Sequence, residues 1–443
     1  MKTNLVLFIL TAIALVSSSF AEAATRTVCF DLVIHNEDQG DCPSVGGGHV
    51  GVRRECNMGG YVRPVGLEVE LWDADDVLAN DDYIGTWRQQ NGLTCVTFTW
   101  EGASYQENEP DPDVYVKIKN RVLLAGSTTN LRILTEAGSV YTYVTSRSMT
   151  NGIANNCHSG QCLINNGDPF YVNGDQASDY SWALMAMDDG QRTLAQYWTE
   201  MPTGTIDIVY PSDIYFGGIS FCDGGTNSAV TTTRHKIDVC PGWAFMAQLV
   251  PHELGHVVMG NEFGLDPVDF VGDYTKGGGA SEWNPTSDEY DGVAVAEGWA
   301  NYVAAVSWWD PENTGADPFD YDFSIVGDDK WVWIEDAAPW EAGSCGLNRG
   351  VPLQVTKAFW DLDDAHNEAA TAPGTSYDTQ DLSTTDIAAA WSDFASGTGN
   401  HQTQEITVNE NGDNIWDFWY RLPSGSNQTN FAVHNCVQSQ QYP

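Results

Sequence analysis

Hydrophobic and polar residues alternate with a period of two along the N-terminal third of the chain. Hydrophobic residues occupy alternate positions in short stretches at residues 28–34, 67–71, 94–100 and 114–118. This pattern predicts strands that bury one face, and glycine, aspartate, asparagine and proline separate the stretches as turn residues do. Short strands at this spacing are typical of a sandwich, so we expect an antiparallel β-sandwich domain over residues 24–147.

The remaining residues follow a helical rather than an alternating pattern. Apolar segments of helical length predict helices at residues 177–200, 292–308, 355–365 and 384–396. A strand is predicted at residues 205–210, where Pro211 ends it, and further strand-like pieces occupy residues 214–240. Gly190 follows two aspartates and is a candidate break in the first helix. We therefore expect a multidomain protein in which an α+β domain, residues 148–443, follows the sandwich.

One further apolar segment, residues 247–260, contains the motif His-Glu-x-x-His. His252 and His256 are four residues apart, so a helix places both imidazoles on one face, where they can bind one metal ion. Glu253 lies about 100° around the helix from His252, where it can reach a water beside that ion. The hydrophobic flanks predict a buried helix, in which histidines need partners. We interpret the motif as a zinc site.

Two residues of this segment are unusual in a helix. Pro251 has no N–H and removes the bond to the carbonyl of Ala247, so the helix either kinks or begins anew there. Gly255, between the histidines, lowers helix propensity and leaves room for a neighbouring element. We expect the helix to end near Gly260.

The predicted helix at residues 292–308 has one carboxylate on a surface of small side chains. Glu297 shares a stripe with Ala294, Ala300, Asn301 and Ala304. Small side chains let another helix approach closely, and a buried carboxylate needs a metal, a cation or several donors. We therefore predict that Glu297 is a metal ligand.

The first residues are typical of a secretory signal peptide. Lys2 precedes an apolar run at residues 5–16 and a small-x-small cleavage site at residues 21–23. We expect residues 1–23 to be removed and the protein to be secreted or otherwise exported. The apolar run is too short to cross a bilayer, and no later stretch is long enough, so we expect no stable membrane span.

The chain contains 10 cysteines, and an even number suits disulfides in an oxidising compartment. None of the CxxC or C…H spacings of a structural zinc module is present, which favours disulfides over metal binding. The close pair Cys157 and Cys162 suits a local disulfide. Cys222 and Cys240 bracket strand-like pieces and form a second candidate pair.

Acidic residues dominate the charge, with 61 against 19 basic residues and a net charge of −42. Such a charge repels nucleic acid and anionic membranes, so we expect neither as a partner. Solubility or adaptation to salty surroundings explains it better than calcium does, because no acidic cluster matches a known calcium loop. Residues 409–413 lack the glycine and the terminal glutamate of an EF-hand, and we interpret them as a polar turn.

A group of aspartates between two predicted strands is a second candidate calcium site. The group consists of Asp73, Asp75, Asp76, Asp81 and Asp82. We expect them to be solvated turn residues, and a Ca²⁺ site is the competing interpretation.

Two resemblances to known families follow from these motifs. His252, Glu253 and His256, with Glu297 in the sequence EGWANY, resemble the gluzincins, zinc metallopeptidases with HExxH on one helix and a glutamate ligand on a later one. This resemblance covers roughly residues 175–310. It implies Zn²⁺ bound by the two histidines and Glu297, with Glu253 as the catalytic base.

The second resemblance concerns residues 66–120, which are similar to transthyretin-like and related sandwich modules of secreted proteins. The similar sequences are GLEVELWDADD, DDYIG, NGLTCVTFTW and PDVYVKIKN. The resemblance implies a binding or spacing module, and a removable pro-segment is the alternative.

The chain departs from the gluzincin pattern at Asn301, because thermolysin-like members have an acidic residue four positions after the glutamate ligand. The oxyanion-stabilising residue is unassigned. The candidates for it are Tyr302, His366 and Tyr420. Glu262 is a rival third ligand, but a metzincin-type site needs glycine and histidine where this chain has Met259 and Glu262, so we favour Glu297.

The ligand set predicts a secreted zinc metallopeptidase that hydrolyses peptide bonds in peptide or protein substrates through a metal-activated water. Three protein ligands leave one position open for water, and Glu253 takes a proton from it as it attacks a carbonyl. Two alternatives stay open. One is an exported binding or adhesion protein with a vestigial metal site, which would have no use for Glu253. The other is a zinc hydrolase of a non-peptide ester or amide, which would use the same chemistry.

Overall fold

The computed structural model describes a defined part of the chain. The described residues are 24–35, 61–62, 66–74, 81–90, 92–100, 114–123, 128–144, 161–163, 170–173, 179–197, 199–212, 215–216, 219–220, 229–241, 248–263, 291–308, 318–320, 331–333, 355–356, 359–360, 363 and 386–388. The predictions for the signal peptide at residues 1–23, for the polar turn at 409–413 and for the pair formed by Cys157 and Cys162 lie outside them or concern side chains that are not described.

The chain divides into two compact units, each assembled from more than one segment. The first comprises Met1–Val33, Arg63–Lys119 and Thr142–Val172, and the second comprises Ile34–Val62, Asn120–Tyr141 and Asn173–Pro443. We expected one boundary near residue 147. The division differs because Asn120–Tyr141 contains a strand, β8 (Thr129–Leu134), that pairs with a strand of the C-terminal part.

One sheet of the first unit is built on β1 (Ala24–Phe30). This strand pairs along its length with the antiparallel β6 (Thr94–Trp100) and, over part of it, with the parallel β10 (Gln161–Leu163). Cys29 lies opposite Cys95 in this register, and a disulfide joins the two. The parallel strand departs from the purely antiparallel arrangement that the sequence predicted.

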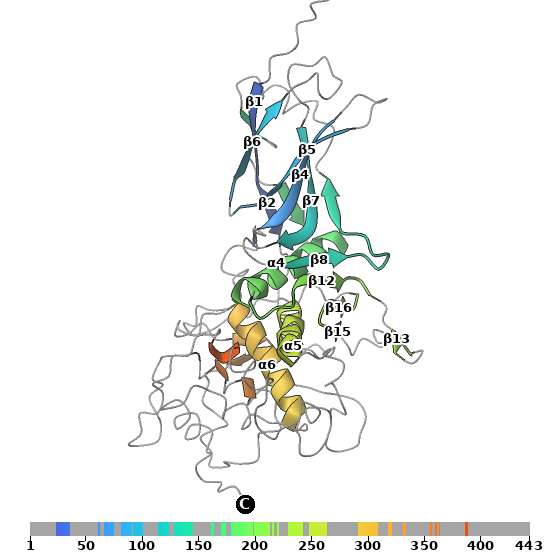
Figure 1. The fold of residues 1–443 in the computed structure, drawn as a ribbon, viewed down its shortest axis with the longest axis vertical. Coiled ribbons are helices and arrows are strands. Elements are labelled where there is room, and N and C mark those ends of the chain that lie inside the picture. The colour runs from blue at the N-terminus through green and yellow to red at the C-terminus, as the bar shows by residue number, and fades with distance from the viewer. Residues whose placement is uncertain are drawn as a thin grey trace, which may run out of the picture. The chain divides into compact units, whose positions relative to one another are not determined.

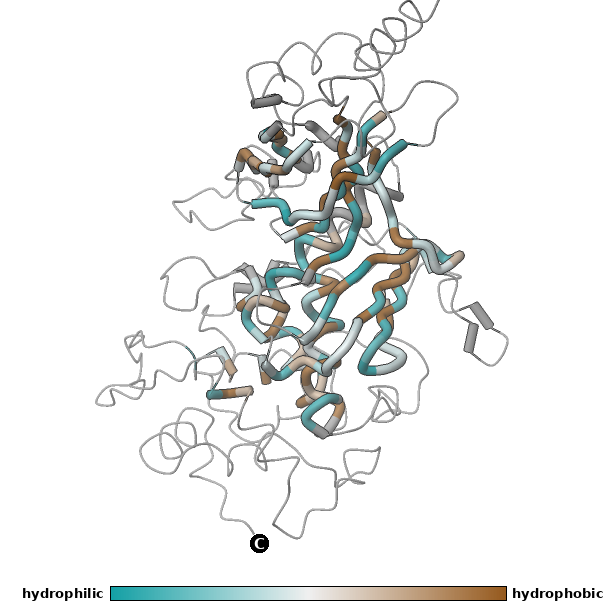
Figure 2. The backbone as a smooth tube through the Cα atoms, turned by 45° about the horizontal axis from the view of Figure 1, so that its top comes forward, coloured by the Kyte–Doolittle hydropathy of each residue, from teal (hydrophilic) through white to brown (hydrophobic). Residues whose placement is uncertain are grey.

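The other strands of the first unit are antiparallel pairs. β4 (Leu67–Asp73) pairs with β5 (Asp82–Arg88), and the first part of β7 (Val114–Leu123) pairs with β9 (Thr142–Val144). The alternating hydrophobic side chains are buried at Val28, Phe30, Leu32, Leu67, Val69, Leu71, Val96, Trp100, Val114, Val116 and Ile118. Figure 2 shows this alternation of hydrophobic and hydrophilic residues along the strands, so the expected β-rich N-terminal region is present.

The sheet of the second unit contains parallel strands. β8 pairs in parallel with β12 (Gly204–Val209), and β12 pairs in parallel with β16 (Lys236–Val239). β15 (Ala229–Thr233) pairs antiparallel with β16 and ends the strand order, while the last residues of β7 pair antiparallel with β8. The strand predicted at residues 205–210 is therefore confirmed as β12.

Three helices of the second unit pack against one another, and two of them also pack against this sheet (Figure 1). They are α4 (Asp179–Gln196), α5 (Leu249–Phe263) and α6 (Asp291–Trp308). α4 contacts β8, and α5 contacts β15. Polar contacts also join α4 to α6: the hydroxyls of Thr193 and Ser307 are 2.9 Å apart, and the Gln196 amide donates to the Val306 carbonyl at 2.6 Å.

Gly190 does not break α4, which is one continuous helix. A Cβ at this position would lie 2.6 Å from Leu131 Cδ2 and 3.2 Å from Val250 Cγ1. The glycine therefore lets α4 approach β8 and α5 closely, and that packing outweighs its cost of about 1 kcal/mol in helix propensity.

The remaining described elements are short. The strands are β2 (Leu32–His35), β3 (Tyr61–Val62), β11 (Phe170–Asn173), β13 (Tyr215–Phe216), β14 (Ile219–Ser220), β17 (Pro318–Asp320) and β18 (Trp331–Trp333). Residues 355–356, 359–360, 363 and 386–388 are helical, within the helices predicted at 355–365 and 384–396. None of the described helices is long and apolar enough to cross a membrane.

Candidate metal centre

α5 begins where the sequence allows a helix to contain Pro251. The helix starts at Leu249, so the proline lies in the first turn, where backbone N–H groups have no partner within the helix. The first bond of the helical type runs from the His252 N–H to the Gln248 carbonyl at 3.0 Å. Of the two outcomes expected for Pro251, the structure therefore has a helix start and not a kink. It ends at Phe263, beyond the expected Gly260.

Gly255 allows α6 to lie very close to the histidine face of α5. A Cβ on Gly255 would stand 2.8 Å from the Cα of Ala300 and 3.2 Å from the Cβ of Val303. The indole N–H of Trp299 donates to the Gly255 carbonyl at 3.0 Å and fixes this contact. The predicted close approach of a neighbouring element to Gly255, and of a helix to the small-residue stripe around Glu297, is confirmed.

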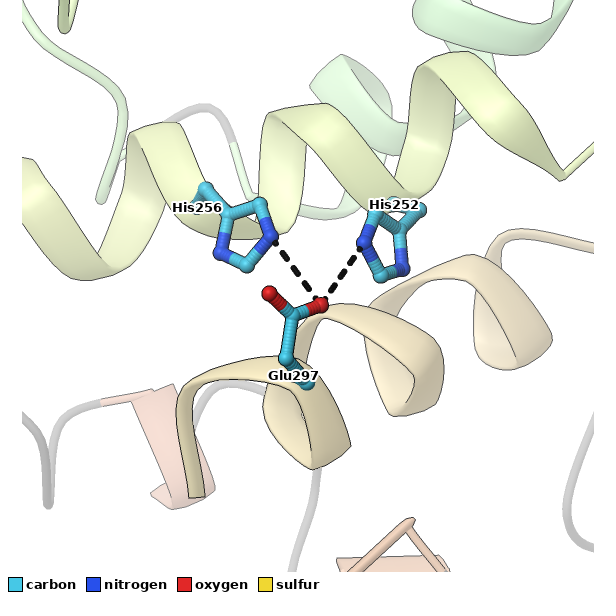
Figure 3. A group of neighbouring side chains, drawn as sticks. All are labelled: His252, His256 and Glu297. Atoms are coloured by element: carbon cyan, nitrogen blue, oxygen red, sulfur yellow. Dashed lines mark ion pairs between the residues drawn. The ribbon is translucent and has the colours of Figure 1, made fainter. Parts of the chain in front are cut away.

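This approach brings the side chains of His252, His256 and Glu297 together (Figure 3). Glu297 Oε2 lies 3.2 Å from His252 Nε2 and 3.5 Å from His256 Nε2. All three side chains are buried, and among the described residues they are the one group of three whose ligand atoms lie close enough, within 4.8 Å, to hold a metal ion.

Glu297 Oε2 is close enough to the Nε2 atoms of both histidines for one ion to be shared by the three side chains. The donor set of two imidazoles and a carboxylate is one that first-row divalent ions accept.

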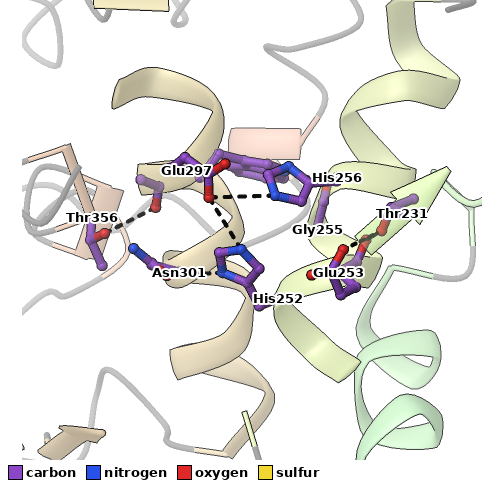
Figure 4. A network of polar contacts seen from close by, with 10 residues as sticks. Thr231, His252, Glu253, Gly255, His256, Glu297, Asn301 and Thr356 are labelled. Atoms are coloured by element: carbon purple, nitrogen blue, oxygen red, sulfur yellow. Dashed lines mark hydrogen bonds and ion pairs between the residues drawn. The ribbon is translucent and has the colours of Figure 1, made fainter. Parts of the chain in front are cut away.

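Asn301 determines which nitrogen of His252 faces the centre. Its side-chain oxygen lies 2.9 Å from His252 Nδ1 (Figure 4). If that nitrogen carries the proton, it donates to the amide oxygen, and the lone pair of Nε2 is left for a metal. The group that contacts His252 Nδ1 is therefore a neutral amide.

The charges at the centre are strongly coupled. Burial raises the pKa of Glu297, but the charge of His256 and hydrogen bonds from both imidazoles outweigh burial and bring this pKa down to about 2. Burial lowers the pKa of His256, and the charge and hydrogen bond of Glu297 together raise it above its ordinary value. Without a metal, the ionised carboxylate of Glu297 therefore favours a proton on His256.

Glu253 is buried beside the ligands, with 6% of its surface exposed, and has a partner that the sequence did not indicate. The hydroxyl of Thr231, on β15, lies 2.6 Å from Glu253 Oε2 and 3.0 Å from the Glu253 carbonyl oxygen (Figure 4). No pattern in the sequence marks Thr231, because its position depends on how β15 packs against α5. The sequence alone could show only that this threonine stands in a predicted strand.

The rival ligand Glu262 is not part of the group that could hold a metal. α5 continues through this residue, and six helical positions place it about 120° around the axis from His256.

Tyr302, a candidate for the oxyanion-stabilising residue, instead donates its hydroxyl proton to Asp363 at 2.8 Å. Burial and the charge of Asp363 raise the pKa of Tyr302 well above its ordinary value. His366 and Tyr420, the other oxyanion candidates, lie outside the described residues.

The aspartates proposed as solvated turn residues are described only in part. Asp73 and Asp82 lie opposite each other at the ends of β4 and β5. The prediction of a solvated turn residue is wrong for Asp73, because it belongs to β4 and only 1% of its surface is exposed. Asp81 accepts a hydrogen bond from the Tyr115 hydroxyl at 2.6 Å. Among the described residues these aspartates do not form a group that could hold a metal. Asp75 and Asp76 are not described.

Comparisons of the chain with protein-family models, with curated proteins and with solved structures found no match. The chemistry of this centre is therefore inferred from its own side chains.

Proposed function

We propose that the protein is a zinc-dependent metallopeptidase with the ligand arrangement of a gluzincin. The observation that carries this proposal is the convergence of His252 and His256 from α5 with Glu297 from α6. A vestigial site would not need to keep Glu253 buried at their side.

Zinc is the metal that this donor set favours. Two imidazoles and one carboxylate are a ligand set typical of catalytic zinc, which takes three protein ligands and leaves one position open. Bound there, zinc would polarise a substrate carbonyl and make a water acidic enough to react near neutral pH.

The residues of the chain supply the rest of the reaction. His252, held by Asn301, presents Nε2 to the ion, and Glu297 completes the ligand set from a rigid helix. Glu253 accepts a proton from the attacking water and delivers it to the leaving nitrogen as the peptide bond breaks. Peptides and unfolded proteins are the proposed substrates.

We also infer that the protein is exported. The disulfide between Cys29 and Cys95 supports this inference, since such bonds persist in oxidising compartments. Cys240 is disulfide-bonded as well, to a cysteine whose side chain is not described. In an exported protein the N-terminal strands would serve as the binding or spacing module that residues 66–120 resemble.

The decisive experiment measures zinc content and hydrolysis of an unfolded protein substrate for three proteins. The unchanged protein should bind one zinc ion and hydrolyse the substrate, and chelation should abolish the activity. Glu253→Gln should keep zinc and lower turnover by about 10²- to 10⁴-fold, because a general base contributes that much. His235→Ala is the matched control, since His235 is exposed on the turn between β15 and β16, and it should keep both zinc and activity.

Two results would refute the proposal. One is zinc-loaded protein that hydrolyses no peptide substrate. The other is a Glu253→Gln variant with the activity of the unchanged protein.

A further inference from the structure

Thr231 makes two contacts with one residue of another element. It lies on β15, the strand that ends the order of the second unit's sheet, and only 3% of its surface is exposed. Its Oγ1 is 2.6 Å from Glu253 Oε2 and 3.0 Å from Glu253 O. A hydroxyl has one proton to donate, so only one of these two oxygens is the main acceptor.

The carboxylate is the better acceptor of the two. It is the nearer atom, and hydrogen bonds to an ionised acceptor are shorter and stronger than those to a neutral carbonyl. A hydrogen bond from Thr231 to the Glu253 carbonyl alone would be enough to join β15 to α5. The contact with Oε2 does something further, because it restricts the three side-chain torsions of Glu253.

The sheet holds Thr231 firmly in this position. Thr231 lies opposite Ile237 of β16, and the register shifts between Thr231 and Thr233. Bulges of this kind change the direction in which a side chain points. Because χ1 of threonine is also stiff, the hydroxyl is a well-placed donor before Glu253 arrives.

We propose that Thr231 is a positioning residue for the catalytic base: its hydroxyl holds Oε2 of Glu253, so that Oε1 is the oxygen presented to the attacking water. This inference rests on the proposed function, in which Glu253 is the base. The bond between Thr231 and Glu253 includes none of the metal ligands, so loss of the hydroxyl should lower turnover and leave zinc binding unchanged.

The test replaces the hydroxyl with a methyl group of similar size. Thr231→Val should lower kcat by about 10- to 100-fold, the effect expected when a catalytic group is misplaced, while KM and zinc affinity stay within about twofold. Thr231→Ser keeps the hydroxyl and should restore most of the lost turnover. Thr193→Val is the matched control, because Thr193 is equally buried and bonds to Ser307; it should lower stability and leave kcat unchanged.

A second readout does not depend on activity. In zinc-free protein, Thr231→Val and Glu253→Ala should be coupled in a double-mutant cycle of unfolding. Each substitution changes the unfolding equilibrium constant by some factor. The product of the two single-variant factors should exceed the factor of the double variant by at least about threefold.

The proposal would be overturned if Thr231→Ser were as slow as Thr231→Val, or if the two substitutions were additive in unfolding. Failure of the proposed function would look different. Zinc-loaded unchanged protein would then be inactive on peptides, while the unfolding cycle would still decide whether Thr231 holds Glu253.

Discussion

The contact between Gly255 and α6 makes Gly255→Ala a strong test of the centre. The new Cβ would lie 2.8 Å from the Cα of Ala300, and ordinary contact begins at 3.4 Å, so the helices must separate by 0.6 Å. Overpacking costs about 1–3 kcal/mol, and alanine returns about 1 kcal/mol of helix propensity. We expect a net loss of up to about 2 kcal/mol in the free energy of unfolding.

The same movement displaces Glu297 from the two histidines. Metal sites need their ligands placed within about 0.5 Å, so zinc affinity should fall by about 10- to 100-fold. The assay is competition with a zinc chelator, together with urea unfolding of the zinc-free protein. Gly190→Ala is the control, because its Cβ would mainly meet the flexible end of Leu131; it should lose stability but keep zinc affinity. Unchanged stability and zinc affinity in Gly255→Ala would refute the reasoning.

Three further outcomes are expected. Glu297→Ala should purify without stoichiometric zinc while Glu262→Ala keeps it, and metal analysis showing the reverse would exclude the gluzincin arrangement. Asn301→Ala removes the acceptor 2.9 Å from His252 Nδ1 and should weaken zinc binding by about 10- to 100-fold in chelator competition. Folding lowers the pKa of Glu297 from 4.5 to about 2, so the ionised carboxylate contributes to the free energy of unfolding of zinc-free protein. This contribution should be lost as the pH drops from about 4.5 towards 2. Acid unfolding of the Glu297→Gln variant should lack this loss of stability. Equal acid sensitivity of the variant and the unchanged protein would contradict the prediction.

The elements that the sequence predicted well are those whose signal is local. Alternation along residues 67–71 and 94–100 reports which face of a strand is buried, and this face does not depend on the neighbouring strand. The spacing of His252 and His256 fixes their common face in the same way. Glu297 was also within reach, because the small residues around it showed which side of its helix another helix could approach.

The features that the sequence did not predict depend on pairing between distant segments. The partners of β8 and β10 follow from strand order, which alternation does not encode. The disulfide between Cys29 and Cys95 follows from the register of β1 and β6, whereas the sequence suggests pairs of cysteines that are close along the chain. Thr231 was missed for the same reason, since its importance arises only where β15 meets α5.

The charge of the centre explains why an amide at Asn301 suits it. Glu253 and Glu297 are both buried beside the histidines, and buried acidic groups favour a nearby cation. An aspartate at position 301 would add another acidic group within hydrogen-bond reach of His252. Without metal, the charge and hydrogen bond of Glu297 raise the pKa of His256, which favours a proton on that imidazole. A metal ion would have to displace such a proton, and the neutral amide of Asn301 orients the His252 ring without attracting a further one.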